Sequence, residues 1–214
     1  MEDLTFEEVR VIGALIEKEL TTPEYYPLTV NSLMNACNQK SNRDPVVSFD
    51  EQTVEVILDS LRGKGLARRV TGSDIRVAKY RQSFTEKLNL TLAETAITCV
   101  LILRGAQTTG EIKGRTGRMF EFESLASVEE ILKNLAEREN PLVIKLPRQA
   151  GMKESRYAHL LSGKPEIENK EAQKVIEAEA DQNKIEVIQI ELELLKAKLE
   201  DLQSQFDKFK KQFD

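Results

Sequence analysis

Hydrophobic residues in the first part of the chain recur with the spacing of a helix face, and the same pattern occurs twice. Two matching sets stand 86 residues apart: Val11, Leu15 and Ile16, then Ile97, Leu101 and Ile102. A Thr-x-x-Glu sequence, typical of a helix N-terminus closed by a capping box, precedes each set. Each set predicts an amphipathic helix, and the repetition predicts a duplicated unit.

A second match, at an offset of 74 residues, predicts another helix in each copy. Its two sets are Val54, Ile57, Leu58 and Leu61, then Val128, Ile131, Leu132 and Leu135. Two strand-like segments separated by a turn follow each set, within residues 66–81 and 142–160, and they predict two β-hairpins. A shorter helix is expected between these two helices in each copy, over residues 30–37 and 109–116.

Three helices followed by a hairpin is the order of a winged-helix unit. The chain is therefore expected to be mainly α, in the α+β class. Two tandem winged-helix domains are expected at residues 1–84 and 88–162. An unrelated pair of α+β modules is the alternative.

After Pro165 the apolar residues follow the alternating steps of 3 and 4 that mark a coiled-coil seam. The seam residues are Ile185, Ile188, Leu192, Leu195, Leu199, Leu202, Phe206, Phe209 and Phe213. We expect a linker or helical segment at 163–183 and a C-terminal coiled coil at 184–214 that joins two chains into a homodimer. The alternative is a helix that folds back onto its own chain.

Composition and charge narrow the function classes. The chain is 40% apolar and 31% charged, with a formal net charge of −5. Residues 165–214 hold 8 basic and 13 acidic side chains, so the acidic excess lies in the tail. The overall field therefore does not steer the protein toward nucleic acid. No apolar run approaches the roughly 18 residues of a membrane span, and the acidic N-terminus has no signal-type stretch, so we expect no membrane contact.

Residue types that usually carry catalysis or bind metals are scarce. The chain has two Cys and one His, too few for a disulfide framework or a Cys/His zinc site. His159 is expected in a strand and Cys37 and Cys99 in helices, where such residues are usually structural. No dinucleotide-binding or P-loop motif is present. We expect no enzyme, and no catalytic residue, metal, cofactor or evident small-molecule ligand.

Basic residues cluster toward the end of the third helix and on the hairpin of each copy. They are Arg62, Lys64, Arg68, Arg69, Arg76, Lys79 and Arg81 in the first copy, and Arg148, Lys153 and Arg156 in the second, which also has Arg104, Lys113, Arg115, Arg118 and Lys145 earlier on. In a winged helix such residues suit contact with phosphates, so double-stranded DNA is a candidate partner. The alternative is a solvated charged surface.

Carboxylates on the third helix argue against the usual way of binding DNA. They include Asp50, Glu51, Glu55 and Asp59 in the first copy, and Glu129 and Glu130 in the second. Winged-helix proteins that bind DNA place this helix in the major groove, where carboxylates repel phosphates. Two functions are therefore expected: a transcription-regulator-like DNA-binding dimer with basic wings, or a protein-interaction adaptor without DNA contact.

Longer strings resemble the signature of the YceH family. They include Thr22-Pro23-Glu24, Tyr26-Pro27-Leu28, Ala36-Cys37-Asn38-Gln39-Lys40-Ser41-Asn42-Arg43, Leu103-Arg104-Gly105-Ala106-Gln107-Thr108 and Glu154-Ser155-Arg156-Tyr157. The resemblance runs from the first helix to the last hairpin. It implies a cytoplasmic bacterial protein with tandem winged-helix domains, and it implies no activity, cofactor or catalytic residue.

The polar loop after the second helix is a candidate partner surface. Its candidate residues are Asn38, Gln39, Lys40, Asn42 and Arg43. The alternative is a loop whose Asn side chains satisfy its own backbone.

The tail is expected to make the chain self-associate. Burial of each seam side chain is worth about 1.5–3 kcal/mol, and nine of them outweigh an association cost of about 4–15 kcal/mol. Analytical ultracentrifugation at micromolar concentration should give a dimer for the full chain and a monomer for a chain without residues 180–214. Monomers in both cases would contradict the prediction.

Overall fold

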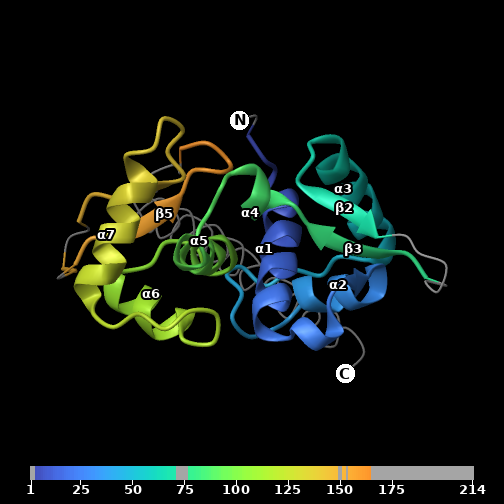
Figure 1. The fold of residues 1–214 in the computed structure, drawn as a ribbon, viewed down its shortest axis with the longest axis horizontal. Helices are drawn as coiled ribbons and strands as arrows, with labels where there is room; N and C mark the ends of the chain where they lie inside the picture. The colour runs from blue at the N-terminus through green and yellow to red at the C-terminus, as the bar shows by residue number, and fades with distance from the viewer. Residues whose placement is uncertain (1–2, 71–76, 149–150, 153, 165–214) are drawn as a thin grey trace, which may run out of the picture. The chain divides into compact units, whose positions relative to one another are not determined.

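The structure is a computed structural model that describes residues 3–70, 77–148, 151–152 and 154–164 (Figure 1). These residues belong to one compact unit. The predicted coiled coil at 184–214, and nearly all of the segment before it, lie outside the described residues. Self-association therefore stays a prediction.

Each half of the described chain has the same order of three helices followed by an antiparallel hairpin. The first half consists of α1 (Phe6–Thr21), the 3-10 helix η1 (Pro23–Tyr25), β1 (Leu28–Thr29), α2 (Val30–Cys37), α3 (Glu51–Gly63), β2 (Ala67–Val70) and β3 (Lys79–Gln82). The second half consists of α4 (Phe84–Lys87), α5 (Leu92–Arg104), α6 (Thr109–Thr116), α7 (Leu125–Ala136), β4 (Val143–Lys145) and β5 (Tyr157–His159). The expected mainly helical α+β class is confirmed.

A short extended segment before the second helix of each half pairs with the hairpin. In the first half β1 pairs with β3 through Leu28 and Tyr80, which gives the strand order β1-β3-β2. In the second half Gln107 forms a corresponding bridge to Tyr157 beside the two-stranded sheet of β4 and β5. The sequence did not predict β1 or α4, because elements of 2 and 4 residues are too short for a periodic signal.

The glutamates in the capping boxes of α1 and α5 also form hydrogen bonds with basic residues at the ends of α3 and α7. Glu8 caps α1 and accepts a hydrogen bond from Lys64 Nζ, at the end of α3, at 2.8 Å. Glu94 caps α5 and accepts from Arg138 Nη2, after α7, at 2.7 Å. Burial alone would raise the pKa of each carboxyl, but hydrogen bonds from the cation and from the capped residue outweigh burial and lower it. The two cations stand 74 residues apart, so both halves use the same ion pair.

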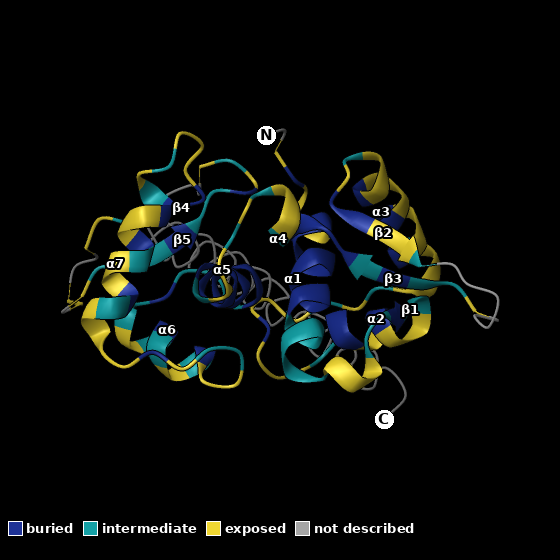
Figure 2. Cartoon of the chain, in the orientation of Figure 1, coloured by how far each residue is buried: buried dark blue, intermediate teal, exposed yellow. Residues whose placement is uncertain are grey.

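Helices α1 and α5 form the middle of the molecule and cross each other (Figure 1). All residues at 8–16 in α1 and at 94–103 in α5 are buried. Figure 2 shows this buried centre, with exposed residues on the outer helices such as α3 and α7. One hydrophobic core includes residues of both halves, and the division into domains at 1–84 and 88–162 stays a prediction. No described helix combines the length and the apolar character that crossing a membrane requires.

The two central helices approach closely at Gly13. Its carbonyl oxygen lies 3.6 Å from the thiol of Cys99, which donates to it. A Cβ added at Gly13 would lie 2.4 Å from Cγ2 of Ile102 and 2.8 Å from a methyl carbon of Leu103. Gly13 and Cys99 are 86 residues apart, so equivalent positions of the two copies face each other.

We expect Gly13→Ala to destabilise the protein. Alanine favours a helix over glycine by about 1 kcal/mol, but the new methyl group must displace the stiff, β-branched Ile102, and such overpacking costs about 1–3 kcal/mol. Gly114→Ala in α6 is the matched control, because a Cβ there meets nothing within 4 Å. Urea unfolding should show a loss of stability for Gly13→Ala and none for Gly114→Ala. Equal effects would contradict close packing at Gly13.

Candidate functional site

The basic residues of the first hairpin are partly neutralised within the chain. Arg68 on β2 lies directly opposite Arg81 on β3, a position in which like charges repel. Glu86 of α4 pairs with both, 3.3 Å from Arg68 and 3.2 Å from Arg81. These side chains are exposed, so each pair contributes little stability. The shared carboxylate nevertheless reduces the positive charge that this hairpin can offer to a phosphate.

Two candidates near the end of α3 also have carboxylate partners. Arg62 Nη1 lies 2.7 Å from Asp59, and Lys64 is bonded to Glu8 as described above. Four of the seven basic candidates in the first copy are therefore paired inside the chain.

The other predicted basic residues are less constrained. Those that the structure describes are Arg69, Lys79, Arg148 and Arg156. Of these four residues, only Arg156 forms an ion pair within the described part of the chain. Its partner is Glu111, at 4.0 Å. Arg76 and Lys153 lie outside the described residues.

The loop between α2 and α3 is closed by its own side chains. Asn38 Nδ2 donates to the carbonyl of Phe49 at 2.7 Å, and Asn38 Oδ1 accepts from the amide of Phe49 at 2.8 Å. Such a pair is what a loop that satisfies its own backbone requires. Lys40 is exposed on this loop, and Gln39 is half-buried.

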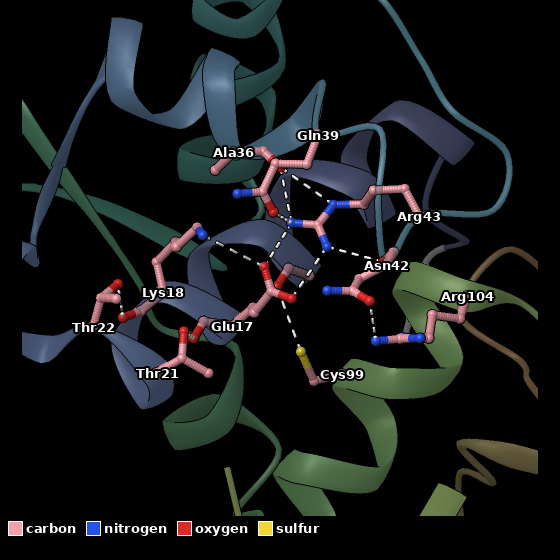
Figure 3. A network of polar contacts seen from close by, with 11 residues as sticks. Glu17, Lys18, Thr21, Thr22, Ala36, Gln39, Asn42, Arg43, Cys99 and Arg104 are labelled. Atoms are coloured by element: carbon pink, nitrogen blue, oxygen red, sulfur yellow. Dashed lines mark hydrogen bonds and ion pairs between the residues drawn. The ribbon is translucent and has the colours of Figure 1, made fainter. Parts of the chain in front are cut away.

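Arg43 is the centre of a polar network beneath the loop (Figure 3). Its side chain is fully buried and donates to both carboxylate oxygens of Glu17 in α1, at 3.1 and 2.6 Å. It also donates to the carbonyl of Ala36 at 2.8 Å and to Oε1 of Gln39 at 3.0 Å. A buried guanidinium needs such partners. Arg43 therefore belongs to the interior, and its guanidinium is occupied by partners within the chain.

The outer end of the loop contacts the second half of the chain. The amide of Asp44 donates to the carbonyl of Leu103 at 2.8 Å. Arg104, the last residue of α5, donates to Oδ1 of Asn42 at 2.6 Å (Figure 3). The loop predicted as a partner surface thus joins the two halves of the same chain.

A groove between the start of α1 and the outer face of α3 has an acidic rim. We call it the α1–α3 groove; it encloses about 480 Å³. Its lining residues are Thr5, Glu7, Glu8, Asp50, Gln52, Thr53, Val56, Ile57 and Ser60. Glu7 and Asp50 are exposed, and hydrogen bonds from Thr53 lower the pKa of Asp50. Val56 is an apolar side chain that is 66% exposed in this acidic surrounding.

The cysteines are buried, and the histidine is half-buried. Burial raises the pKa of Cys37 to about 12 and also raises the pKa of Cys99, so both stay thiols. Burial lowers the pKa of His159 to about 4, so it is neutral at physiological pH. The described residues contain no group of three or more His, Cys, Asp or Glu side chains that could hold a metal ion. That the chain is not an enzyme stays a prediction.

Proteins similar to this chain occur in several bacteria. Residues 4–152 match the family described as "Protein of unknown function, DUF480". A UPF0502 protein of Solibacter usitatus is 53% identical over 185 residues, which cover 86% of this chain and 88% of that protein. A UPF0502 protein of Citrifermentans bemidjiense is 57% identical over 166 residues, 78% of this chain and 77% of that protein. One of Geotalea uraniireducens is 58% identical over 160 residues, 75% and 73% of the two chains.

We expect Arg43→Ala to be strongly destabilising. Removing the guanidinium leaves the Glu17 carboxylate, 15% exposed, without its buried partner, and breaking such a pair costs about 3–5 kcal/mol. Urea unfolding of the variant measures this loss. Arg69→Ala is the control at an exposed arginine, where a change within about 0.5 kcal/mol is expected. The double variant Glu17→Leu/Arg43→Leu should lose less than Arg43→Ala, because no charge is left unpaired. An effect of Arg43→Ala as small as that of the control would refute the role of the pair.

Proposed function

This chain belongs to the DUF480 family, the YceH family that its sequence resembles, and we propose that it is a cytoplasmic protein-interaction adaptor built from two tandem winged-helix modules. The order of three helices and a hairpin in each half supports the winged-helix assignment. The strand β1 beside the first hairpin, and the Gln107 bridge beside the second, support it further.

The acidic outer face of α3 is the observation that carries this proposal. In winged-helix proteins that bind DNA, this helix enters the major groove. Here its exposed side chains include Glu51, Glu55 and Asp59, with Arg62 as the basic residue of its last turn. The corresponding helix α7 exposes Glu129 and Glu130. Both faces would repel phosphates, and a protein surface of opposite charge is the partner that suits them.

The α1–α3 groove is the proposed docking site, and its chemistry specifies the partner. The rim carboxylates Glu7 and Asp50 suit Lys or Arg side chains. Val56 suits an apolar side chain placed between them. The proposed occupant is therefore a basic segment of another protein that carries at least one apolar side chain. If the tail also joins two chains, the dimer presents two such grooves and gains avidity for a partner with two segments.

DNA binding by the wings is the second candidate function. The observation that favours it is the exposure of Arg69 on β2 and of Arg148 after β4, because exposed hairpin arginines suit phosphate contact. The carboxylate partners of Arg62, Lys64, Arg68 and Arg81 weigh against it.

A peptide and a DNA duplex distinguish the two candidates. The full chain should bind a labelled amphipathic Lys/Leu peptide in fluorescence anisotropy, with an affinity that falls as salt rises. Glu7→Lys should weaken this binding by about tenfold, because it reverses a rim charge. Glu129→Lys makes the same charge change on α7, outside the groove, and should leave the affinity unchanged.

The same samples test the second candidate. At about 50 mM salt, where phosphate contacts are strong, the adaptor proposal expects no retardation of a duplex in a gel. Retardation that is lost in the Arg69→Ala/Lys79→Ala variant would favour DNA binding instead. Equal peptide binding by Glu7→Lys and the wild type would overturn docking in the α1–α3 groove.

A further inference from the structure

A second hollow lies where the loop after α2 meets the second half of the chain. It encloses about 350 Å³, and we call it the arginine cleft. Its lining residues are Asn42, Arg43, Asp44, Arg104, Gln107, Glu111, Arg115 and Arg156. All eight are polar or charged, and four are arginines. They come from three separate segments: the loop, the α5–α6 region and the start of β5.

The cleft has more positive than negative charge. Arg43 is neutralised by Glu17, which leaves the three guanidinium groups of Arg104, Arg115 and Arg156. The two lining carboxylates are Glu111 and Asp44. A single Glu111 oxygen lies 3.5 Å from Arg115 Nη2 and 4.0 Å from Arg156 Nη2. Three cations and two carboxylates therefore line the cleft, which leaves an excess of one positive charge.

The charged groups of the cleft influence one another's pKa values. Burial lowers the pKa of Arg104, and the neighbouring Arg115 lowers it further. Burial would raise the pKa of Glu111, but the hydrogen bonds with Thr108 and the nearby charges of Arg156 and Arg115 lower it. An additional anion in the cleft would relieve this repulsion.

The lining side chains are held in place before any ligand arrives. Arg104 is fixed by Asn42 at 2.6 Å (Figure 3). Arg156 Nη1 donates to the carbonyl of Ala106 at 3.5 Å. Gln107 is 4% exposed, its backbone bridges to β5, and its Oε1 is buried without a hydrogen-bond partner among the described residues. Such preorganisation lowers the entropic cost of binding.

We infer that the arginine cleft binds a compact phosphate dianion, either inorganic phosphate or the phosphoryl group of a small ester. Arginine forks match the oxygens of phosphate and bind them bidentately. The volume is at the lower end of the range for small-molecule sites. None of the eight lining residues is aromatic, so the cleft offers no ring on which a nucleobase could stack.

Phosphate in this cleft would connect the two halves of the chain. Asn42 comes from the first half and the three arginines from the second, whereas the Asp44 carboxylate of the first half would repel the dianion. The bound dianion would replace repulsion at this junction by attraction. This role is independent of the α1–α3 groove, whose lining shares no residue with the cleft.

Calorimetric titration of the full chain tests the inference. Inorganic phosphate and glycerol 3-phosphate are titrated separately in chloride buffer of constant ionic strength, and saturable binding of one anion per chain is expected. Arg115→Gln and Arg156→Gln should each weaken binding by about tenfold or more, since each removes charged hydrogen bonds. Arg148→Gln makes the same change at an exposed residue outside the cleft and should bind as the wild type does.

Glu111→Gln tests the inference in the opposite direction, because this variant should strengthen the binding of phosphate. It removes the carboxylate that competes with phosphate for Arg115 and Arg156, while glutamine can still serve in the capping box of α6. We expect tighter binding. Melting curves in chloride confirm that each variant is folded, and if an arginine variant is unfolded the Glu111→Gln result decides.

Each result of the titrations either identifies the class of ligand or overturns the inference. Tighter binding of glycerol 3-phosphate identifies a small phosphate ester as the ligand class, and equal or weaker binding identifies phosphate itself. Absence of saturable binding by the wild type at millimolar concentrations overturns the inference. Affinities in Arg115→Gln, Arg156→Gln and Glu111→Gln equal to that of the wild type overturn it as well.

Discussion

The close crossing of α1 and α5 is the constraint on which the rest of the described structure depends. Gly13 has no side chain, so Ile102 and Leu103 occupy the space that a Cβ would take. Because α2 and α3 pack on α1, and α6 and α7 pack on α5, this contact determines how the two halves meet. The loop after α2 then reaches the end of α5, where the amide of Asp44 donates to the carbonyl of Leu103 and Asn42 accepts from Arg104. The arginine cleft exists because those segments meet there.

Acidic and basic side chains gather at different places on this framework, and each place suits a different kind of ligand. Carboxylates line the α1–α3 groove on the outside of the first half. Guanidinium groups gather at the junction between the halves. Some of the other charges neutralise one another, as Glu86 does for Arg68 and Arg81. A cationic protein segment and a small anion would therefore be attracted to different places and would not compete.

The sequence predicts the parts of this molecule that depend on periodic burial. Helices α1, α3, α5 and α7 follow from apolar spacing, and α2 agrees with its expected range. The strand β1 and the Gln107 bridge could not be predicted, because one or two residues have no period. For Asn38 the sequence offered the alternative that the structure shows, a side chain bonded to the backbone of its own loop. It identified Arg43 but not that Arg43 faces inward, since a polar loop looks the same whether it faces solvent or a buried carboxylate. Arg104, Arg115 and Arg156 were visible as basic residues. Their common cleft was not, because only the folded chain brings three distant segments together.

Gly13 in α1 and Cys99 in α5 stand 86 residues apart, the offset between the first helices of the two halves, and they touch each other. In a symmetric pair of separate, identical chains, a contact on the symmetry axis brings a residue against its own copy, so both sides must have the same size. In a single polypeptide the two places are encoded independently. One can then lack a side chain while the other carries a thiol that donates to the carbonyl of the first. Covalent linkage of the halves thus permits an unequal, closely packed contact that identical subunits cannot make on a symmetry axis.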